Sequence, residues 1–323
     1  RRMLRRCINM SDEPLITIVI PVRDRAMVVG DTLRSVAAQT LRPLCVVLVD
    51  NGSCDRTPEV LRLWAEMLDA RGIFTRVVSE PRPGASCARN RGLREVPTPY
   101  VMFFDSDDTM SPDHCRNVAD GIIAAGYPDI AGWPVRQGHF DGSVSVGRFC
   151  SRNLMVNHLF HGCMSTQRFA AKTEFVRSVG AWNECLRGWD DYELGIRMLC
   201  ATKSVVRLPL KPDTVVMVPQ EESITGTAYS HDPAKWEEAL DICAELLASG
   251  KGHGLLRWID VRRIILAGEY VREGECALSA SLMERVLASA PSAWRRTVYR
   301  FLHSYFVKVG RGVSVLARIL LYK

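Results

Sequence analysis

Three carboxylates stand within four positions directly after an apolar run. The run is Tyr100–Phe104, and the carboxylates belong to Asp105, Asp107 and Asp108. Consecutive apolar residues predict a buried strand, so the acids are expected at its C-terminal end, where open α/β sheets bind ligands. Like charges this close repel one another unless a cation lies between them, and oxygen ligands suit Mg²⁺ or Mn²⁺, which pair with substrate phosphates. The alternative is a solvated acidic turn that caps the next helix.

Acidic residues also follow the other strands predicted in the first third of the chain. The predicted strands are Leu15–Ile20, Leu44–Val49, Phe74–Val78 and Tyr100–Phe104, and the predicted helices are 28–39, 57–70 and 85–93. This alternation is typical of a Rossmann-like, mostly parallel sheet flanked by helices. Because parallel strands end at one edge, we expect Asp24, Asp50, Glu80 and Asp105 to line one crevice.

Two common phosphate-binding motifs are missing from the sequence. No G-x-G-x-x-G follows the first predicted strand, and no G-x-x-x-x-G-K-[ST] is present. Dinucleotide binding and NTPase activity are therefore disfavoured. A nucleotidyltransferase would need a Gly-rich basic loop after the first strand, whereas Pro21–Arg25 contains no glycine.

Size and composition limit the class of protein. The chain has 323 residues, a net charge of +6 and 47% hydrophobic residues, which fits a globular protein with one large and one smaller domain. It contains no apolar run long enough to predict a membrane-spanning helix. Eleven cysteines without a C-x-x-C pair favour reduced thiols and a cytoplasmic location. We predict a basic, disordered extension over 1–14, a main domain over 15–228 and a helical region over 229–323.

Five short motifs occur in order along residues 15–225. They are Ile18-Val19-Ile20-Pro21, Asp50-Asn51-Gly52-Ser53-Cys54-Asp55, Gly84–Gly92, Phe104-Asp105-Ser106-Asp107-Asp108 and Gly188–Arg197. Together they resemble the family 2 glycosyltransferases, inverting enzymes of the GT-A fold. The resemblance implies transfer of a sugar from a nucleotide-sugar donor, with a UDP-sugar favoured, to a hydroxyl of a glycan or lipid-linked acceptor. Such an activity would belong to polysaccharide biosynthesis at the cell envelope.

The resemblance also assigns residues to the donor site. Asp50 would accept a hydrogen bond from the nucleobase, Asn51 would stand where the family often has a second Asp, and Pro21 to Asp24 would form the wall of the base pocket. Asp105 would hold the ribose. Arg89 would contact phosphate or, equally, pair with an acid at a strand end. The Asn-Gly pair that follows Asp50 is also a good turn in its own right.

By the same resemblance, metal binding and base catalysis fall on further acids. Asp107 would bind the Mg²⁺ or Mn²⁺ that bridges the donor phosphates, and Asp108 would support the site or cap the next helix. An inverting transfer needs a carboxylate to take the proton of the attacking hydroxyl, and the family places it at Asp191. Asp190 replaces the family's Glu and would alter how the pair titrates. Alternatively, these two acids simply begin a helix, where carboxylates favour the N-terminal dipole.

The acceptor half of the chain contains several aromatic candidates. Trp133, Trp182 and Trp189 fall in or near it. Sugars stack on aromatic faces, although core packing is expected for at least two of the three. The family often carries a His on a late loop, whereas residues 218–225 contain none and the next His is His231.

In the last part of the chain, apolar residues recur at the spacing of an α-helix. This part ends in a segment rich in basic and aromatic residues. Residues 291–323 contain no acid but carry Arg295, Arg296, Arg300, Lys308, Arg311, Arg318 and Lys323. We expect a helix over 294–321 to lie on an anionic membrane surface, at the inner face of the membrane. Docking on the catalytic domain is the alternative.

Two further functions are weighed against a transferase. Nucleic acid is not an expected partner, because no recognised motif accompanies the basic charge. A catalytically silent relative that binds glycans or protein partners is the main alternative function. The presence of Asp50, Asp105, Asp107 and Asp191 argues against it.

Overall fold

The structure is a computed structural model that describes residues 13–139, 142–149, 152–217, 228–249 and 252–321. The chain divides into two compact units, each with its own hydrophobic core. The sheet unit comprises the described parts of residues 1–152, 163–184 and 201–219. The helical unit comprises the described parts of residues 153–162, 185–200 and 220–323. The domain limits expected from the sequence, at residues 15 and 229, stay a prediction.

Seven strands form the central sheet of the sheet unit, in the order β10-β6-β9-β4-β1-β2-β3. Their bounds are β1 Ile16–Val22, β2 Leu44–Asp50, β3 Ile73–Ser79, β4 Tyr100–Phe103, β6 Ile130–Gly132, β9 Phe169–Lys172 and β10 Val205–Arg207. All neighbouring pairs are parallel except those of β9, which runs antiparallel to β4 and to β6. The predicted Rossmann-like, mostly parallel sheet is therefore confirmed.

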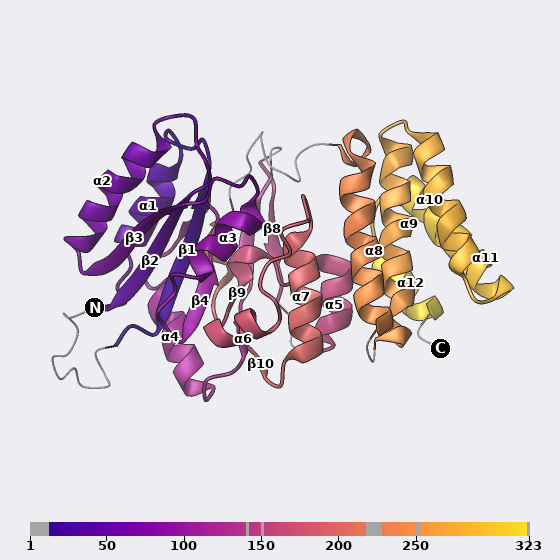
Figure 1. Cartoon of the computed structure of the whole chain (residues 1–323). Coiled ribbons are helices and arrows are strands. Elements are labelled where there is room, and N and C mark those ends of the chain that lie inside the picture. The colour runs from indigo at the N-terminus through magenta and orange to yellow at the C-terminus, as the bar shows by residue number, and fades with distance from the viewer. Residues whose placement is uncertain (1–12, 140–141, 150–151, 218–227, 250–251, 322–323) are drawn as a thin grey trace. The chain divides into compact units, whose positions relative to one another are not determined.

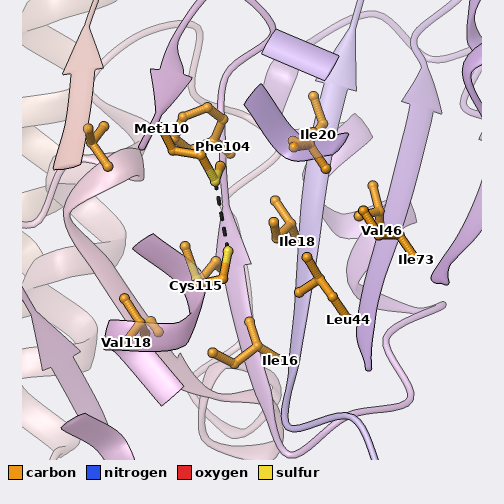
Figure 2. Close-up of a cluster of buried hydrophobic side chains, with 14 of the residues drawn as sticks. Ile16, Ile18, Ile20, Leu44, Val46, Ile73, Phe104, Met110, Cys115 and Val118 are labelled. Carbon is orange, nitrogen blue, oxygen red and sulfur yellow. Dashed lines mark hydrogen bonds between the residues drawn. The ribbon is translucent and has the colours of Figure 1, made fainter. Parts of the chain in front are cut away.

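Helices flank this sheet on both faces (Figure 1). They include α1 Val29–Ala37, α2 Thr57–Asp69, α3 Ala85–Leu93 and α4 His114–Ala124, with the shorter α6 Thr173–Ser178 after β9. Side chains alternate across a strand, so Ile16, Ile18 and Ile20 pack with residues of α1, α2 and α4 in one core (Figure 2). Val19 points to the opposite face, where α3 lies.

Helix α3 approaches β1 and β2 closely because Gly92 has no side chain. A Cβ atom at Gly92 would lie 2.4 Å from Val19 Cγ1 and 3.0 Å from Val49 Cγ2. Interiors are close-packed and cannot absorb such an overlap without a shift of the backbone. This packing matters for function because the same helix carries Arg89 and Asn90.

A second, smaller sheet has the strand order β5-β11-β7-β8. Its strands are β5 Thr109–Met110, β7 Val135–Gly138, β8 Val144–Gly147 and β11 Val215–Met217. β5 begins directly after Asp108 and pairs antiparallel with β11, so the chain is anchored immediately beyond the acidic loop. The sequence did not predict this sheet, because strands this short carry almost no periodic signal.

The helical unit is built around α9. Its helices are α5 Leu154–His161, α7 Asp190–Ala201, α8 Pro233–Ser249, α9 Leu256–Arg272, α10 Cys276–Ser289, α11 Ala293–Val309 and α12 Val313–Leu321. α9 packs against α5, α8, α10, α11 and α12. The predicted helical C-terminal region is confirmed, but the single helix expected over 294–321 is two helices. Gly310 and Gly312 separate them with φ angles of 71° and 82°, which glycine adopts without a Cβ clash.

Within the described parts of the chain, no helix combines the length and the apolar character needed to cross a membrane. The cysteines that the structure describes are all free thiols.

Candidate functional site

The ends of neighbouring strands meet at one edge of the central sheet, as predicted. The backbone N–H of Glu80, after β3, donates to the carbonyl of Asp50 at 2.8 Å. The backbone N–H of Phe104, after β4, donates to the carbonyl of Val19 at 3.0 Å. The loop that begins at Asp105 therefore lies at the same edge as the turns after β2 and β3.

The loop after β1 is bound to the turn after β2. Asp24 Oδ1 accepts a hydrogen bond from the Cys54 backbone N–H at 2.7 Å, and Ser53 Oγ accepts one from the Asp24 backbone N–H at 3.0 Å. These reciprocal bonds hold Asp24 at a left-handed φ of 49°, a conformation that non-glycine residues adopt only when their surroundings impose it. Pro21 is half-buried in β1. The segment expected to form the wall of the base pocket thus abuts the turn that carries Asp50.

Asp50 and Asn51 are both buried but differ in their remaining hydrogen-bonding capacity. Asn51 Nδ2 donates to the carbonyls of Glu80 at 2.9 Å and Arg82 at 2.7 Å, and Asn51 Oδ1 accepts from the Gly84 N–H at 3.0 Å. The Asp50 carboxylate accepts a bond from one backbone N–H of its own turn, at 3.2 Å. Asn51 therefore holds the loop before α3, whereas Asp50 keeps acceptor capacity. Contact between Asn51 and a base stays a prediction.

Two side chains orient the carboxylate of Asp105. Arg89 Nη2 donates to Oδ1 at 2.9 Å, and the amide of Gln167 donates to Oδ2. Gln167 also donates to Oδ2 of the buried Asp108 at 2.6 Å, so one amide joins the two carboxylates. The residue at the start of α4 is Asp113, and a supporting role of Asp108 stays a prediction. Gln167 lies in a short 3₁₀ helix, η1 Thr166–Arg168. Sequence reasoning missed it, because it follows Asp105 by 62 residues and no local pattern marks it.

Asp107 is the carboxylate of this loop that the protein leaves available. Burial, followed by repulsion from Asp105, raises the pKa of Asp107 to about 6, and the nearby Arg25 acts in the opposite direction. None of the described side chains donates a hydrogen bond to it. A bound cation would offset both causes of the raised pKa, because it favours the charged carboxylate.

These residues fit a divalent cation that binds together with a phosphate-bearing substrate. No group of three or more His, Cys, Asp or Glu side chains in the described part of the chain forms a complete metal site. Mg²⁺ needs fewer protein ligands, because it is usually held by one or two carboxylates together with substrate phosphates and water. Asp107 offers such a carboxylate, whereas both oxygens of Asp105 already accept hydrogen bonds.

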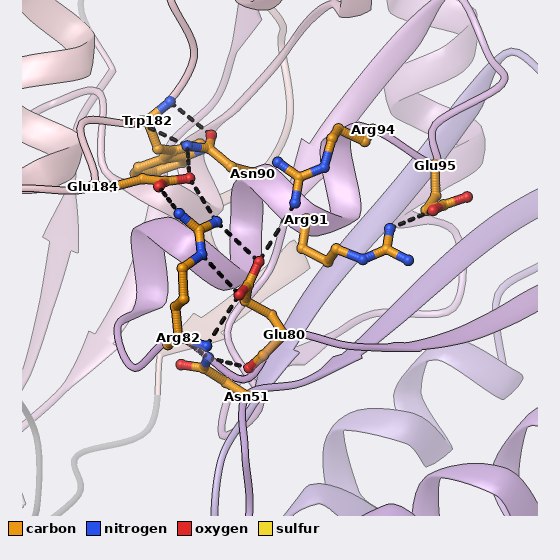
Figure 3. Close-up of polar contacts among 9 residues, drawn as sticks. All are labelled: Asn51, Glu80, Arg82, Asn90, Arg91, Arg94, Glu95, Trp182 and Glu184. Atoms are coloured by element: carbon orange, nitrogen blue, oxygen red, sulfur yellow. Dashed lines mark hydrogen bonds and ion pairs between the residues drawn. The ribbon is translucent and has the colours of Figure 1, made fainter.

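A network of ion pairs holds the loop between β3 and α3 (Figure 3). Buried Glu80 accepts a bond from Arg82 Nε at 3.0 Å and pairs with Arg94 at 3.4 Å. The hydrogen bond from Arg82 is the main reason that the pKa of Glu80 lies below its usual range. Glu184 joins the network, since it pairs with Arg82 and accepts from Asn90 Nδ2 at 2.9 Å. Glu80 thus joins the loop before α3 to Arg94 at the C-terminal end of this helix, a role that sequence reasoning did not assign to it or to Glu184.

In the helical unit, Asp190 and Asp191 open α7. Both are half-buried, and the Asp191 backbone N–H donates to Asp190 Oδ1 at 3.1 Å. Glu193 of the same motif is buried and pairs with Arg197 at 2.6 Å. The later half of the motif therefore stabilises the helix, and the two aspartates stand at its N-terminus, where carboxylates are favoured. The role of Asp191 as a base stays a proposal.

Two of the three candidate tryptophans belong to the core. Trp133 and Trp182 are buried, whereas Trp189 is half-buried and lines a pocket of the helical unit. The late loop 218–225 lies outside the described residues. His231 is exposed at the end of the 3₁₀ helix η3, Tyr229–His231.

The sheet order and the acidic edge define an α/β fold of the GT-A type, and solved structures agree. The crystal structure of S. aureus TarS 1-349 in complex with UDP-GlcNAc superposes with a TM-score of 0.68, over 94% of this chain and 92% of that chain, at 14% identity. The mannosyltransferase PcManGT from Pyrobaculum calidifontis, in complex with GDP-Man and Mn²⁺, gives a TM-score of 0.54 over 95% of this chain and 87% of that one, at 17% identity. The predicted GT-A fold is confirmed.

The sequence of the sheet unit is similar to a known family. Residues 17–161 match the sequence profile described as Glycosyl transferase family 2, as the motifs of this segment predicted. A relative, the glycosyltransferase GlyA of Streptococcus pneumoniae, is 32% identical over 108 residues. The aligned segment covers 33% of this chain and only 15% of GlyA.

Proposed function

We propose that this chain is an inverting glycosyltransferase. It moves a sugar from a nucleoside-diphosphate donor, with UDP as the favoured nucleotide, to a hydroxyl of a glycan or lipid-linked acceptor. The sheet unit supplies the donor site, and Asp191 of the helical unit supplies the base. Structural neighbours in complex with UDP-GlcNAc and with GDP-Man and Mn²⁺ support a nucleotide-sugar donor.

The observation that carries this proposal is the contrast between Asp105 and Asp107. Arg89 and Gln167 orient Asp105, so this carboxylate is a fixed hydrogen-bond acceptor suited to ribose hydroxyls. Asp107 is available to a cation. A Mg²⁺ or Mn²⁺ ion held there would stabilise the negative charge that develops on the diphosphate leaving group as the glycosidic bond breaks.

The choice of nucleotide rests on Asp50. An ionised carboxylate only accepts hydrogen bonds, so Asp50 suits a base with a ring N–H. Uracil, thymine and guanine each present one, whereas the ring N3 of cytosine is itself an acceptor. The wall formed by Pro21 to Asp24 lies against the turn that carries Asp50.

The proposed base is Asp191. Its carboxylate takes the proton of the acceptor hydroxyl while that oxygen attacks the anomeric carbon, which inverts the configuration there. Asp190 supports this role, because its side chain accepts a hydrogen bond from the Asp191 backbone N–H and so fixes the first turn of α7.

The C-terminal helices supply the proposed membrane-surface contact. Trp294 of α11 and Ile319 of α12 are 64% and 67% exposed. Basic residues of both helices, and no acids, accompany them. Exposed apolar side chains beside Lys and Arg are favoured at an anionic lipid surface, and this placement would bring the enzyme to lipid-linked acceptors at the inner face of the membrane.

Calorimetric titration of UDP, GDP, CDP and dTDP, each with Mn²⁺ and with EDTA, tests the donor site. Wild-type protein is expected to bind UDP in the presence of Mn²⁺ and to lose most affinity in EDTA. Asp107→Ala should abolish the gain in UDP affinity that Mn²⁺ provides. Asp120→Ala changes an exposed aspartate of α4 and serves as the matched control that retains binding.

The outcomes separate the candidate functions. Metal-dependent binding of one nucleotide, lost in Asp107→Ala only, supports the transferase. If the folded wild-type protein binds none of the four nucleotides, the transferase proposal fails and the silent glycan-binding relative takes its place.

A further inference from the structure

The helical unit contains a pocket of about 260 Å³. Its walls include Phe160 at the end of α5, Trp189 just before α7, Tyr229 of η3, and Arg262 and Glu269 of α9. The turn between α11 and α12 closes another side. All of these residues belong to the helical unit. The volume lies below the range of drug-sized ligands, so the pocket suits one small ring or group.

One face of α9 supplies an arginine and a glutamate to this pocket. Arg262, Ile265, Leu266 and Glu269 all line it, at the i, i+3, i+4 and i+7 spacing that places residues on one helix face. Arg262 Nη1 donates to the carbonyl of Phe160 at 3.3 Å, but the buried Arg262 Nε has no hydrogen-bond partner in the described parts of the chain. Buried donors are normally satisfied, and an exception calls for a missing partner such as a ligand or a water molecule.

Trp189 is held in the pocket wall in a strained conformation. Its φ of 52° is left-handed, and strain of this kind persists where the surroundings impose it, commonly at functional sites. The Arg262 guanidinium lies 4.8 Å from the Trp189 ring centroid, and the Trp236 ring lies 5.0 Å away. Gly188 allows this packing, because a Cβ there would lie 2.9 Å from Trp236. The residues that follow Trp189 are Asp190 and Asp191.

The charges of the pocket indicate the chemical class of its ligand. Arg262 would repel a cation, and Glu269 would repel an anion. Because both line the same small space, the pocket favours a neutral ligand with hydroxyl groups that can accept from the guanidinium and donate to the carboxylate. The aromatic rings of Phe160, Trp189 and Tyr229 provide apolar surface for the C–H face of such a ligand.

We propose that this pocket binds one neutral sugar ring of the acceptor. Its wall residue Trp189 stands two positions before the proposed base Asp191. The acceptor role rests on the proposed function, whereas ring binding by the pocket does not. The acceptor role is assigned because Trp189 of the pocket wall directly precedes Asp190 and Asp191 in the chain, so the pocket would select the acceptor.

Saturation-transfer NMR on the full chain, without nucleotide or metal, tests ring binding directly. The probes are the methyl pyranosides of glucose, galactose and N-acetylglucosamine at millimolar concentrations, with inorganic phosphate and glucose 6-phosphate as the anionic arm. At least one methyl pyranoside is expected to bind. Arg262→Met and the isosteric Glu269→Gln should each weaken its binding by about fivefold or more, because each removes a hydrogen-bonding partner. Arg285→Met changes an arginine that pairs with Glu237 and Asp241 outside the pocket and should leave binding unchanged.

Three results would overturn the pocket proposal: no methyl pyranoside binds the folded protein, binding survives in both pocket variants, or only the phosphate-bearing probes bind. UDP titration of the same samples keeps the two proposals apart. Pyranoside binding without any nucleotide binding would remove the transferase but leave the pocket as a sugar site. UDP binding without pyranoside binding would remove the pocket alone.

Discussion

Arg89 Nη2 donates a hydrogen bond to Asp105 Oδ1 at 2.9 Å, and the same guanidinium lies 4.5 Å from the centroid of the Trp182 ring. The Arg89 side chain is only 7% exposed, against 32% for Asp105. The arginine is therefore set into the core, with its charged end directed at the strand end. Its first role is to orient Asp105, because a charge-assisted bond from a buried donor restricts the carboxylate to one position.

Arg89→Met should weaken UDP binding about tenfold, which is ~1.4 kcal/mol, because Asp105 then keeps only the bond from Gln167. Unfolding free energy should fall by about 2 kcal/mol, since a shielded carboxylate loses a charged partner. Calorimetry and urea denaturation measure the two effects. Arg91→Met, on the same helix, removes an ion pair with Glu95 and is the control. Equal losses in both variants would contradict a specific role for Arg89.

Gln167→Met should disturb the acidic loop as strongly as any change within the loop. The variant leaves Asp105 and Asp108 without the amide that donates to both, and loss of a partner for a buried polar group costs about 1–3 kcal/mol. We expect lower stability in urea and weaker UDP binding. Gln137→Met, in β7 of the same unit, is the control. Unchanged UDP affinity in Gln167→Met would show that Asp105 needs no second donor.

Asp191→Asn should lower the rate of sugar transfer by about a hundredfold or more, because general base catalysis is worth at least that much. UDP affinity should stay within about twofold, since Asn keeps the size of Asp and the proposed donor site lies in the sheet unit. Transfer is followed with a UDP-sugar panel and a glycan acceptor, and NMR reads the anomeric configuration of the product. Strong residual transfer would remove Asp191 as the base, and retained configuration would remove the inverting mechanism.

His114 should make the stability of the sheet unit depend on pH. Its ring is buried, packs edge-on against Trp133 at 5.0 Å, and has no hydrogen-bond partner for either nitrogen in the part of the chain that the structure describes. Burial lowers its pKa from 6.5 to about 3. Between these values the unfolded chain binds the proton and the folded chain does not, so the stability contribution is complete above pH 6.5 and falls as the pH drops toward 3. At pH 5 the loss is about 2 kcal/mol.

Urea denaturation from pH 7.5 to pH 5 measures this dependence. His114→Phe keeps an aromatic ring beside Trp133 but cannot titrate, so its stability should fall less over the same interval. His231→Phe replaces an exposed histidine and should keep the wild-type slope. The hypothesis fails if wild type and His114→Phe have the same slope.

The membrane contact is best tested by surface changes, because α11 also belongs to the core of the helical unit. Tyr299 of this helix is buried and donates to Asp260 Oδ2 at 2.8 Å, so deletion of residues 294–323 would also unfold the packing around α9. The double variant Trp294→Ser with Ile319→Ser should reduce flotation with phosphatidylglycerol vesicles several-fold. The reason is that burial of one apolar side chain contributes about 1.5–3 kcal/mol of free energy. Phe74→Ser removes a similarly exposed ring of the sheet unit and should leave flotation unchanged. Unchanged flotation of the double variant would contradict the proposed membrane-surface contact.

The sequence by itself determined the order of strands and helices in the first third of the chain, from β1 to β4, and the positions of the acids among them. An apolar run stopped by a carboxylate is a local signal, so β2 with Asp50 and β4 with Asp105 could be predicted without any knowledge of their neighbours. Because strands alternate with helices along this segment, the sequence also predicted that the strands pair in parallel. Parallel pairing brings the ends of these strands to one edge of the sheet. The family motifs added the separate roles of Asp107 and Asp191, which still await a test.

Only the tertiary structure decided which of these acids are engaged and which are available. Gln167 reaches Asp105 across 62 residues, and Glu184 reaches Arg82 across 102. No periodicity records contacts between residues that far apart, because they form only when the antiparallel β9 is inserted beside β4. The same holds for the pocket around Arg262 and Trp189, whose walls come from separate helices. Hydrogen-bond partners and burial are properties of the packed chain, and they separate an oriented carboxylate from one that can bind a ligand.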